Sequence, residues 1–597
     1  MKSENVNNQI SDVEKSIIEF IEKYDENDYM NFLKSDDELE KIEALIDTSS
    51  NIVAWYDFNK DSNILEFDAN FGEITKSLVT KLSNVVAIEK SKEKANVITK
   101  RIKNNNLSVF TSTTELNEKF DYILLRNLED LESVKKFLKE DGTILLIFDN
   151  KFGISNFATN NKFKNVCEEK SGLYSKKEIE EYLNANGFFD YNFFYPLPNY
   201  KSTNVVFSDK YLPNYHTTKI MNNRIMGKDN YLTFNELNAL KQLTKDDKFK
   251  EFTNSYLVEI NPKSKVKFVG FNNARNKEYR LCTKIYDEIV TKESTCVESN
   301  SHINNIKDNI MNLKKYGFNI VDEYKNEKIV SKYVSSKTFY QLIIDNIINQ
   351  KIDEAYFLIT KWFEYIKTKF EQSEDKTIYA DLVFENTFYI DNEFYFFDQE
   401  WCIYDAPLEF ILYRAISNIF AYNYEINKII TQNEFLEHFD LLKNIDLFHN
   451  IEKEFQRKII DSNSYKFYNS QEKVIDIDSL INNSKESLIN ELQSELALYK
   501  CENVKKEEYI KKIYEEKENV ISELNLYKEE NTKKEKYILS LQEEIREKSQ
   551  DINDFEKIIN TLKEEINKLE GIINSKEEVI KEFENMKMVK LIKKLKK

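Results

Sequence analysis

Cysteine is scarce in this chain, which has 5 cysteines among 597 residues. The cysteines lie far apart, and none belongs to a C-x-x-C pair or a Cys/His cluster, so neither a disulfide framework nor a zinc site is expected. Long apolar runs are also missing. No stretch of roughly eighteen apolar residues occurs, and the first residues lack the apolar core of a signal peptide. We therefore expect a cytoplasmic protein without a membrane-spanning helix.

Positive charge is in deficit as well. The formal net charge is −18, and no basic stripe spans a domain. Because nucleic-acid backbones bind to basic surfaces, a general nucleic-acid-binding role is not expected. Aromatic residues, by contrast, make up 13% of the chain. The length exceeds what one hydrophobic core usually serves, which predicts two or three domains.

The most informative stretch begins at Asp381. Asn386 follows five residues later, and Asp398 follows after the segment TFYIDNEFYFF. In phosphoryl transfer one carboxylate positions or deprotonates the hydroxyl, while an Asn and a second Asp hold the metal. The intervening segment predicts two short strands around an Asp391-Asn392 turn, which would bring Asp398 back beside Asn386. The simpler alternative is that Asp381 caps a turn and Asp398 pairs with a lysine.

This stretch resembles the catalytic segment of the protein-kinase-like and aminoglycoside-phosphotransferase-like superfamily. Glu400-Trp401 is similar to the D-x-E-W ending of antibiotic and sugar phosphotransferases, more than to the D-F-G of protein kinases. The resemblance implies ATP as the phosphoryl donor, Asp381 as the base, and Asn386 and Asp398 as Mg²⁺ ligands. It also implies a sugar or another small molecule as the acceptor.

Residues 251–340 are expected to form a small sheet and one helix, the front half of an α+β protein-kinase-like domain. The segment NSYLVEI (254–260) is assigned to this sheet. Lys292 resembles the strand lysine that contacts phosphate, with a surface lysine as the alternative. Glu298 at the start of the next helix is expected to orient Lys292 as an ion pair, although another acid lies close. The hairpin expected to cover the phosphates keeps only one glycine, Gly270.

The first part of the chain alternates short apolar strands with helical stretches. Expected strands are 64–67, 84–89, 120–125 and 143–148. This order predicts an α/β fold with a doubly wound parallel sheet. An acid at the end of the second strand, Glu89, matches the residue that accepts ribose hydroxyls in nucleotide-binding βαβ units. A solvated strand end is the alternative for Glu89.

This segment resembles class I S-adenosylmethionine-dependent methyltransferases, whose Rossmann-like fold carries a first turn reading E/D-x-G-x-G-x-G. Glu66 and Gly72 match that pattern, while Asp68 and Asn70 occupy two of the glycine positions. Asn and Asp tolerate positive φ better than most residues, but they add bulk. The resemblance implies that these four residues and Glu89 contact S-adenosylmethionine. A relic turn without cofactor is the alternative.

The C-terminal part carries an apolar seam with three-four spacing from Ile510 to Phe583 and no proline. Such a heptad pattern predicts an all-α coiled coil, parallel and with two or three chains, about 110 Å long. Six lysines alternate with apolar residues in the last twelve positions, 586–597. This basic amphipathic end is suited to an anionic membrane surface, and a frayed helix end is the alternative.

The order of these segments resembles the bifunctional kinase–methyltransferases that cap bacterial O-antigen polysaccharides, and the resemblance covers roughly residues 50–465. It implies a multidomain transferase that modifies a cell-surface glycan or its lipid-linked precursor, with glycosyltransferases as partners and a peripheral place at the inner face of the cell membrane. A non-catalytic scaffold of a glycan-assembly complex is the alternative. The expected organisation is a helical segment (1–45), a methyltransferase-like domain (46–215), a linker (216–250), a kinase-like domain (251–465), a coiled coil (466–585) and the tail (586–597).

Overall fold

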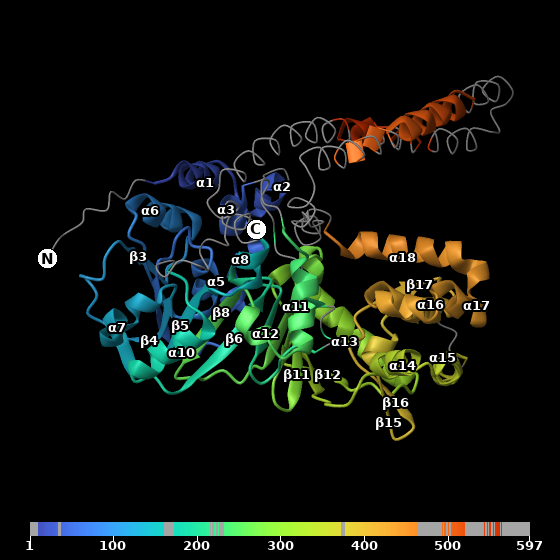
Figure 1. The fold of residues 1–597 in the computed structure, drawn as a ribbon, viewed down its shortest axis with the longest axis horizontal. Helices are drawn as coiled ribbons and strands as arrows, with labels where there is room; N and C mark the ends of the chain where they lie inside the picture. The colour runs from blue at the N-terminus through green and yellow to red at the C-terminus, as the bar shows by residue number, and fades with distance from the viewer. Residues whose placement is uncertain are drawn as a thin grey trace, which may run out of the picture. The chain divides into compact units, whose positions relative to one another are not determined.

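The computed structural model of the chain consists of two compact units, Met1–Val474 and Ile475–Lys597 (Figure 1). The structure describes residues 10–33, 38–159, 172–214, 217, 220–221, 225, 232–371 and 377–461 of the larger unit. In the smaller unit it describes helical positions between 492 and 563, of which 503–519 is the longest run. The predicted tail, 586–597, lies outside the described residues.

Five parallel strands form the first half of the larger unit, in the order β3-β2-β1-β4-β5. They are β1 (Asn63–Phe67), β2 (Asn84–Ile88), β3 (Leu107–Phe110), β4 (Phe120–Leu125) and β5 (Leu138–Asp149). Helices α5 (Thr75–Lys81) and α6 (Lys92–Arg101) connect the first three strands. Ile64 and Leu65 are both fully buried although they point to opposite faces, as expected for a sheet covered on two sides. The predicted parallel α/β sheet is confirmed.

Strand β8 (Ser255–Ile260) lies in this first sheet, antiparallel between β5 and β6 (Tyr191–Leu197). The segment had been assigned to the sheet of the predicted kinase-like part. Every residue of β8 is buried. A strand that is apolar on both faces needs a central position, and the place between β5 and β6 provides one.

The same sheet continues into an antiparallel half, so that all 13 strands are hydrogen-bonded in one series. Its further strands are β7 (Val205–Ser208), β9 (Phe268–Phe271), β10 (Leu281–Ile285), β11 (Ile289–Ser294), β13 (Lys328–Lys332) and β12 (Asp322–Lys325). β7 pairs with both β6 and β9, and thereby joins the two halves. The expected linker region, 216–250, therefore separates segments that share a sheet.

A mainly helical layer follows the antiparallel strands. Its longer helices are α13 (Asn300–Lys315), α14 (Phe339–Ile348), α15 (Ile352–Phe370), α16 (Glu409–Tyr422) and α18 (Ile445–Ile459). Trp362, Phe384 and Phe410 are fully buried in its core. Strands β15 (Thr387–Ile390) and β16 (Glu393–Phe396) form the predicted hairpin, with positive φ at Asp391 and Asn392.

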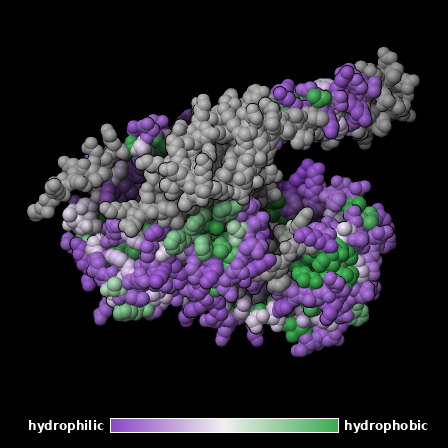
Figure 2. Space-filling model, in the orientation of Figure 1, coloured by the Kyte–Doolittle hydropathy of each residue, from purple (hydrophilic) through white to green (hydrophobic). Residues whose placement is uncertain are grey.

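Helix α1 (Asp12–Lys23) begins at Ser11, whose side chain and that of Glu14 form a capping box. Its buried Ile17 and Phe20 pack in one cluster with Phe71 and Val97, so the N-terminal helices cover the turn after β1. Among the residues that Figure 2 colours by hydropathy, hydrophilic ones cover most of the surface shown, with smaller hydrophobic patches between them. None of the described helices combines the length and the apolar character that a bilayer span requires.

The smaller unit contains two helical segments that pack antiparallel within one chain. Tyr514 donates to Glu556 over 2.8 Å, Lys548 to Glu516 over 2.9 Å, and Lys563 lies 3.6 Å from Glu507. As the residue numbers rise along the first segment, the numbers of their partners in the second segment fall, which is the pattern of antiparallel helices. Seam residues Ile510, Ile513 and Ile559 form the small core between them. The described part of the seam thus packs against a helix of the same chain. This arrangement differs from the continuous parallel rod that the heptad pattern predicted.

Candidate functional site

The predicted phosphoryl-transfer residues converge on one cavity of about 260 Å³. Asp381, Asn386 and Asp398 line it, together with Arg275 and Arg414. They come from the loop after β14 (Thr377–Tyr379), from the turn before β15, from the end of β16, from the turn before β10, and from α16. The predicted hairpin is what returns Asp398 to Asn386.

Lys292 on β11 reaches the same place through ion pairs with Asp398 and Glu400. Burial by itself lowers the pKa of Lys292, but the two carboxylates outweigh this effect and raise it. The expected ion pair with Glu298 was wrong: Glu298 is exposed in the short turn Val297–Ser299. The chain enters α13 so that His302 faces the site instead, with its Nε2 atom 3.3 Å from Glu400.

Asp381 is held from three sides. Its Oδ2 accepts hydrogen bonds from the backbone N–H groups of Glu400 (2.9 Å) and Trp401 (3.1 Å), and its Oδ1 lies 3.2 Å from Nη1 of Arg414. Burial raises the pKa of Asp381 to about 7, against the opposing effect of Arg414. A carboxylate with a pKa near neutrality is suited to accept a proton from a hydroxyl.

Asn386 joins the chain segments that carry Asp381 and Asp398. Its side-chain nitrogen donates to the backbone carbonyls of Asp381 (3.2 Å) and Asp398 (3.3 Å). Among the described residues nothing donates to its Oδ1. Asp398 uses Oδ1 for Lys292, and its N–H donates to the buried carboxylate of Asp322 over 2.6 Å. Asp398 has a φ of 59°, a conformation that turns this residue sharply after β16.

Oxygen atoms of Asn386 and Asp398 fit Mg²⁺, which takes one or two protein oxygens and completes its shell with phosphates and water. Within the described ranges no group of three or more His, Cys, Asp or Glu side chains could hold a metal by itself. The residues present therefore suit a metal that arrives with a nucleotide, better than a resident ion.

Several residues of this site were not predicted from the sequence. Arg275 pairs with Glu400, and Arg414 pairs with both Asp381 and Glu452. Arg414 is the only charged residue within the stretch 410–422, otherwise apolar or uncharged, and that isolation was a usable signal. Arg275 stands in a polar turn, where the sequence offers no comparable sign.

The predicted cofactor turn follows β1. Asp68, Asn70 and Gly72 have φ values of 52°, 53° and 77°. All three therefore adopt the left-handed conformation that glycine normally supplies, and Asp and Asn tolerate it better than most other residues. The backbone shape expected of the glycine motif is present without two of its glycines.

Glu89 lies at the end of β2, where the ribose-binding acid was predicted. Its carboxylate accepts hydrogen bonds from the N–H groups of Asn70 (2.8 Å) and Ser91 (2.9 Å). Burial raises the pKa of Glu89. The Asn70 side chain is bonded to Lys94 (3.1 Å), which also pairs with Glu14 of α1. A polar network thus ties the turn to the N-terminal helix.

Glu66 points into the protein. It is fully buried, accepts from the hydroxyl of Thr75 over 2.7 Å, and lies 3.5 Å from Arg126. Arg126 also pairs with Glu73 over 2.5 Å. Burial raises the pKa of Glu66 to about 7. Glu66 therefore positions the turn, α5 and the end of β4, and Arg126 and Glu73 are members of this cluster that the sequence did not reveal.

These residues fit S-adenosylmethionine in part. Each oxygen of Glu89 accepts one hydrogen bond and has capacity for another, so ribose hydroxyls could still bind. The side chains of Asp68 and Asn70 stand where glycine would leave space. The cavity of about 260 Å³ does not reach Asp68, Asn70 or Glu89.

No family model and no curated protein matches the chain. Solved structures with similarity to it include the plantazolicin methyltransferase BpumL with SAH (11% identity, 42% of this chain and 96% of that chain, TM-score 0.24). Others are DhpI with SAH (11%, 30% and 88%, 0.20) and the N-methyltransferase NodS from Bradyrhizobium japonicum with S-adenosyl-L-homocysteine (13%, 21% and 73%, 0.17). These likenesses are too low to carry an argument about the chain's ligand or reaction.

Proposed function

We propose that this protein transfers a phosphoryl group from ATP–Mg²⁺ to a hydroxyl of a sugar-containing acceptor. The observation that carries the proposal is the convergence of Lys292, Asp381, Asn386 and Asp398, which span more than a hundred positions of sequence, around one small cavity. Phosphoryl transfer is mostly positioning and charge stabilisation, so this set of groups is sufficient for it.

Each residue has a role that its surroundings support. Lys292 and Arg275 bring positive charge beside the cavity, where phosphate oxygens would compete with Asp398 and Glu400 for them. Asn386 and Asp398 would hold Mg²⁺, which when bound neutralises the phosphates. Asp381 would take the proton of the attacking hydroxyl. The positive charge of Arg414 lowers the pKa of Asp381, so that more of this carboxyl group is ionised near neutral pH. Glu400 takes over the pairing with Lys292 for which Glu298 had been expected.

The acceptor class rests on resemblance. The D-x-E-W ending is similar to that of antibiotic and sugar phosphotransferases, and the order of segments is similar to that of enzymes that cap bacterial surface polysaccharides. We therefore propose a glycan or lipid-linked glycan acceptor at the inner face of the membrane, with glycosyltransferases as partners and self-association through residues 466–585. The rival proposal is a scaffold in which neither site turns over.

A second activity, S-adenosylmethionine-dependent methyl transfer, is favoured by one specific observation. The turn after β1 keeps the left-handed backbone at Asp68, Asn70 and Gly72, and Glu89 lies beside it. The bulk of two side chains argues for weak cofactor binding. Methylation of the phosphorylated product would then be the later step.

Calorimetric titration with ATP at millimolar Mg²⁺ tests the first proposal. We expect binding by the full-length protein, its loss in Asp398→Ala, and its retention in Asp381→Ala with turnover lowered by about 10²-fold or more. Asp308→Ala on the exposed face of α13 is the matched control and should behave as the unmodified protein. If the unmodified protein does not bind ATP, the proposal is wrong and the scaffold alternative stands.

A further inference from the structure

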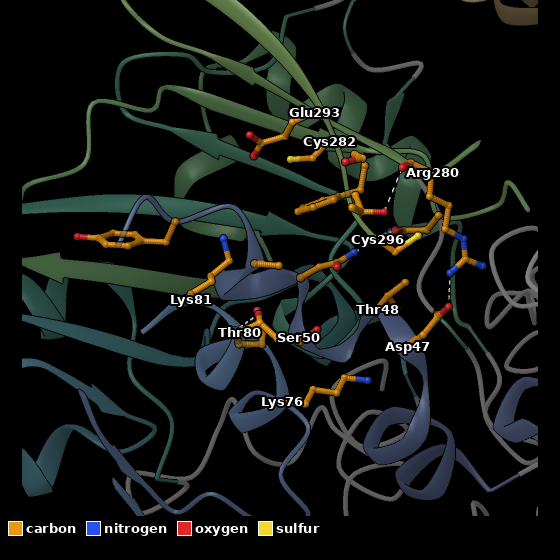
Figure 3. Close-up of a pocket in the computed structure, with 18 of the residues that line it drawn as sticks. Asp47, Thr48, Ser50, Lys76, Thr80, Lys81, Arg280, Cys282, Glu293 and Cys296 are labelled. Atoms are coloured by element: carbon orange, nitrogen blue, oxygen red, sulfur yellow. Dashed lines mark hydrogen bonds and ion pairs between the residues drawn. The ribbon is translucent and has the colours of Figure 1, made fainter. Parts of the chain in front are cut away.

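A second, larger cavity of about 660 Å³ lies between helix α5 and strands β10 and β11 (Figure 3). We name it the α5–β10 cavity. Its volume is within the range of about 300 to 1,000 Å³ that small-molecule sites have. One face of α5 supplies Lys76, Ser77, Thr80 and Lys81, which are neighbours on a helix surface.

The cavity is distinct from the phosphoryl-transfer site because it lies on the other face of the same strands. Lys292 stands opposite Thr283 in the β10–β11 register, and its side chain contacts Asp398. The adjacent pair, Cys282 and Glu293, points to the opposite face, since side chains alternate along a strand. Both Cys282 and Glu293 line the α5–β10 cavity.

Charge in this cavity runs against that of the protein. The whole chain has 104 acidic and 86 basic residues. Seven Lys or Arg side chains line the cavity, but only four Asp or Glu side chains do. Such a concentration of positive charge in an acidic protein favours an anionic ligand.

Several of the cationic side chains that line the cavity form ion pairs with described residues, whereas one lysine of α5 does not. Lys284 is bonded to Asp57 (2.7 Å) and Glu293 (2.8 Å), Arg280 is paired with Asp47, and Lys76 lies 3.3 Å from Glu26.

Lys81 has no hydrogen bond or ion pair with any residue that the structure describes, and it points from α5 towards the strands that carry Cys282 and Glu293 (Figure 3). Burial lowers the pKa of Lys81 and the positive charge of Lys284 lowers it further, which outweighs the opposite influence of the Glu293 and Asp57 carboxylates.

We propose that the α5–β10 cavity binds a small molecule bearing a phosphate or diphosphate group, with Lys81 and Lys284 on either side of that group. An anion there would give Lys81 the partner that the protein itself does not supply, and would relieve its repulsion from Lys284. The hydroxyl of Ser77 lies on the same helix face and can donate to a phosphate oxygen, whereas that of Thr80 already donates to the backbone carbonyl of Ser77 over 2.8 Å. Phe58 and Phe271 among the lining residues provide apolar surface for the organic part.

Calorimetric titration of the full-length protein with inorganic pyrophosphate tests this site. The buffer contains EDTA, which removes the Mg²⁺ on which the phosphoryl-transfer site depends. We expect binding by the unmodified protein and an affinity lower by at least about fivefold in Lys81→Met, because a charge-assisted contact is lost. Lys81→Arg keeps the charge and should bind within about twofold of the unmodified protein. A matched control is Lys92→Met on the exposed surface of α6, which should bind pyrophosphate unchanged.

Asp398→Ala separates this proposal from the proposed function. Pyrophosphate binding that survives in Asp398→Ala but weakens in Lys81→Met supports the α5–β10 site, whether or not ATP is turned over. Binding that is lost in Asp398→Ala assigns the anion to the phosphoryl-transfer cavity and overturns the proposal. Absence of binding by the unmodified protein, or equal affinity in Lys81→Met, overturns it as well.

Discussion

Replacing Arg414 by methionine should move the pH dependence of phosphoryl transfer to higher pH. Asp381 is the proposed base, and the guanidinium of Arg414 lies 3.2 Å from its Oδ1. Burial has already raised the pKa of Asp381 to about 7, and the positive charge of Arg414 is the largest influence that opposes this rise. Methionine keeps much of the packing of the arginine stem while removing its charge.

The size of the shift follows from the geometry. An opposite charge within about 4 to 6 Å changes a carboxyl pKa by about 1 to 3 units. Arg414 also pairs with Glu452 over 3.1 Å, so part of its charge is already offset. We therefore expect the pKa of Asp381 to rise by about 1 to 2 units, and each unit corresponds to about 1.4 kcal/mol. About half of Asp381 is ionised at pH 7 in the unmodified protein, so turnover at this pH should fall by about 5-fold to 50-fold and recover as the pH is raised.

The assay is ATP turnover measured from pH 5.5 to 9.5, with ATP affinity followed in parallel. The unmodified protein should gain activity with rising pH, with a midpoint near pH 7, because only ionised Asp381 accepts a proton. Arg414→Lys retains the positive charge and should therefore leave the midpoint pH almost unchanged. Arg457→Met removes an exposed ion pair with Glu454 on α18 and serves as the control that should not move it.

Superposition of the Arg414→Met and unmodified profiles would refute the reasoning, since the charge next to Asp381 would then have no influence on the titrating group. A uniform loss of activity at every pH would point to a structural role for Arg414 instead. Unchanged ATP affinity is part of the expected result, because Arg414 is not assigned to the nucleotide.

Three further outcomes are expected. Replacing both Asp68 and Asn70 by glycine should improve S-adenosylmethionine affinity in a calorimetric titration; micromolar affinity of the unmodified protein would instead mean that the two side chains do not crowd the turn. Carbodiimide coupling, which joins a carboxylate to an amine without a spacer, should link Glu507 to Lys563 within one chain, because their Oε1 and Nζ atoms lie 3.6 Å apart. A cross-linked band of dimer size on a denaturing gel, without that intrachain link in the peptide map, would favour the parallel oligomer. Removing residues 585–597 should reduce co-sedimentation with anionic vesicles, more so at low salt; equal pelleting of both forms would mean that the tail does not bind lipid.

Several features could be predicted from the sequence because they depend on residues that are close together along the chain. Short runs apolar on both faces predicted the parallel strands, because only a covered sheet buries them. The spacing of Asp381 and Asn386, with an Asp-Asn turn before Asp398, predicted a hairpin that closes the site. Asp68 and Asn70 were recognised as the non-glycine residues that tolerate positive φ, and they adopt it.

Other features depended on partners distant in sequence, and only the tertiary structure decided them. Strand β8 was recognised as a strand, but its place between β5 and β6 depends on pairing with residues up to 116 positions away, as between Ile144 and Ile260. Lys292 forms its ion pair with Glu400 and not with Glu298, because the turn before α13 leaves Glu298 exposed to solvent.

The heptad pattern predicted an apolar stripe on a helix but not which helix packs against it. Ile559 of the same chain packs with Ile513 and so takes the place that a second chain was expected to fill. Sequence periodicity reports which face is buried, and the partner is set by which pairings the whole chain can make at once.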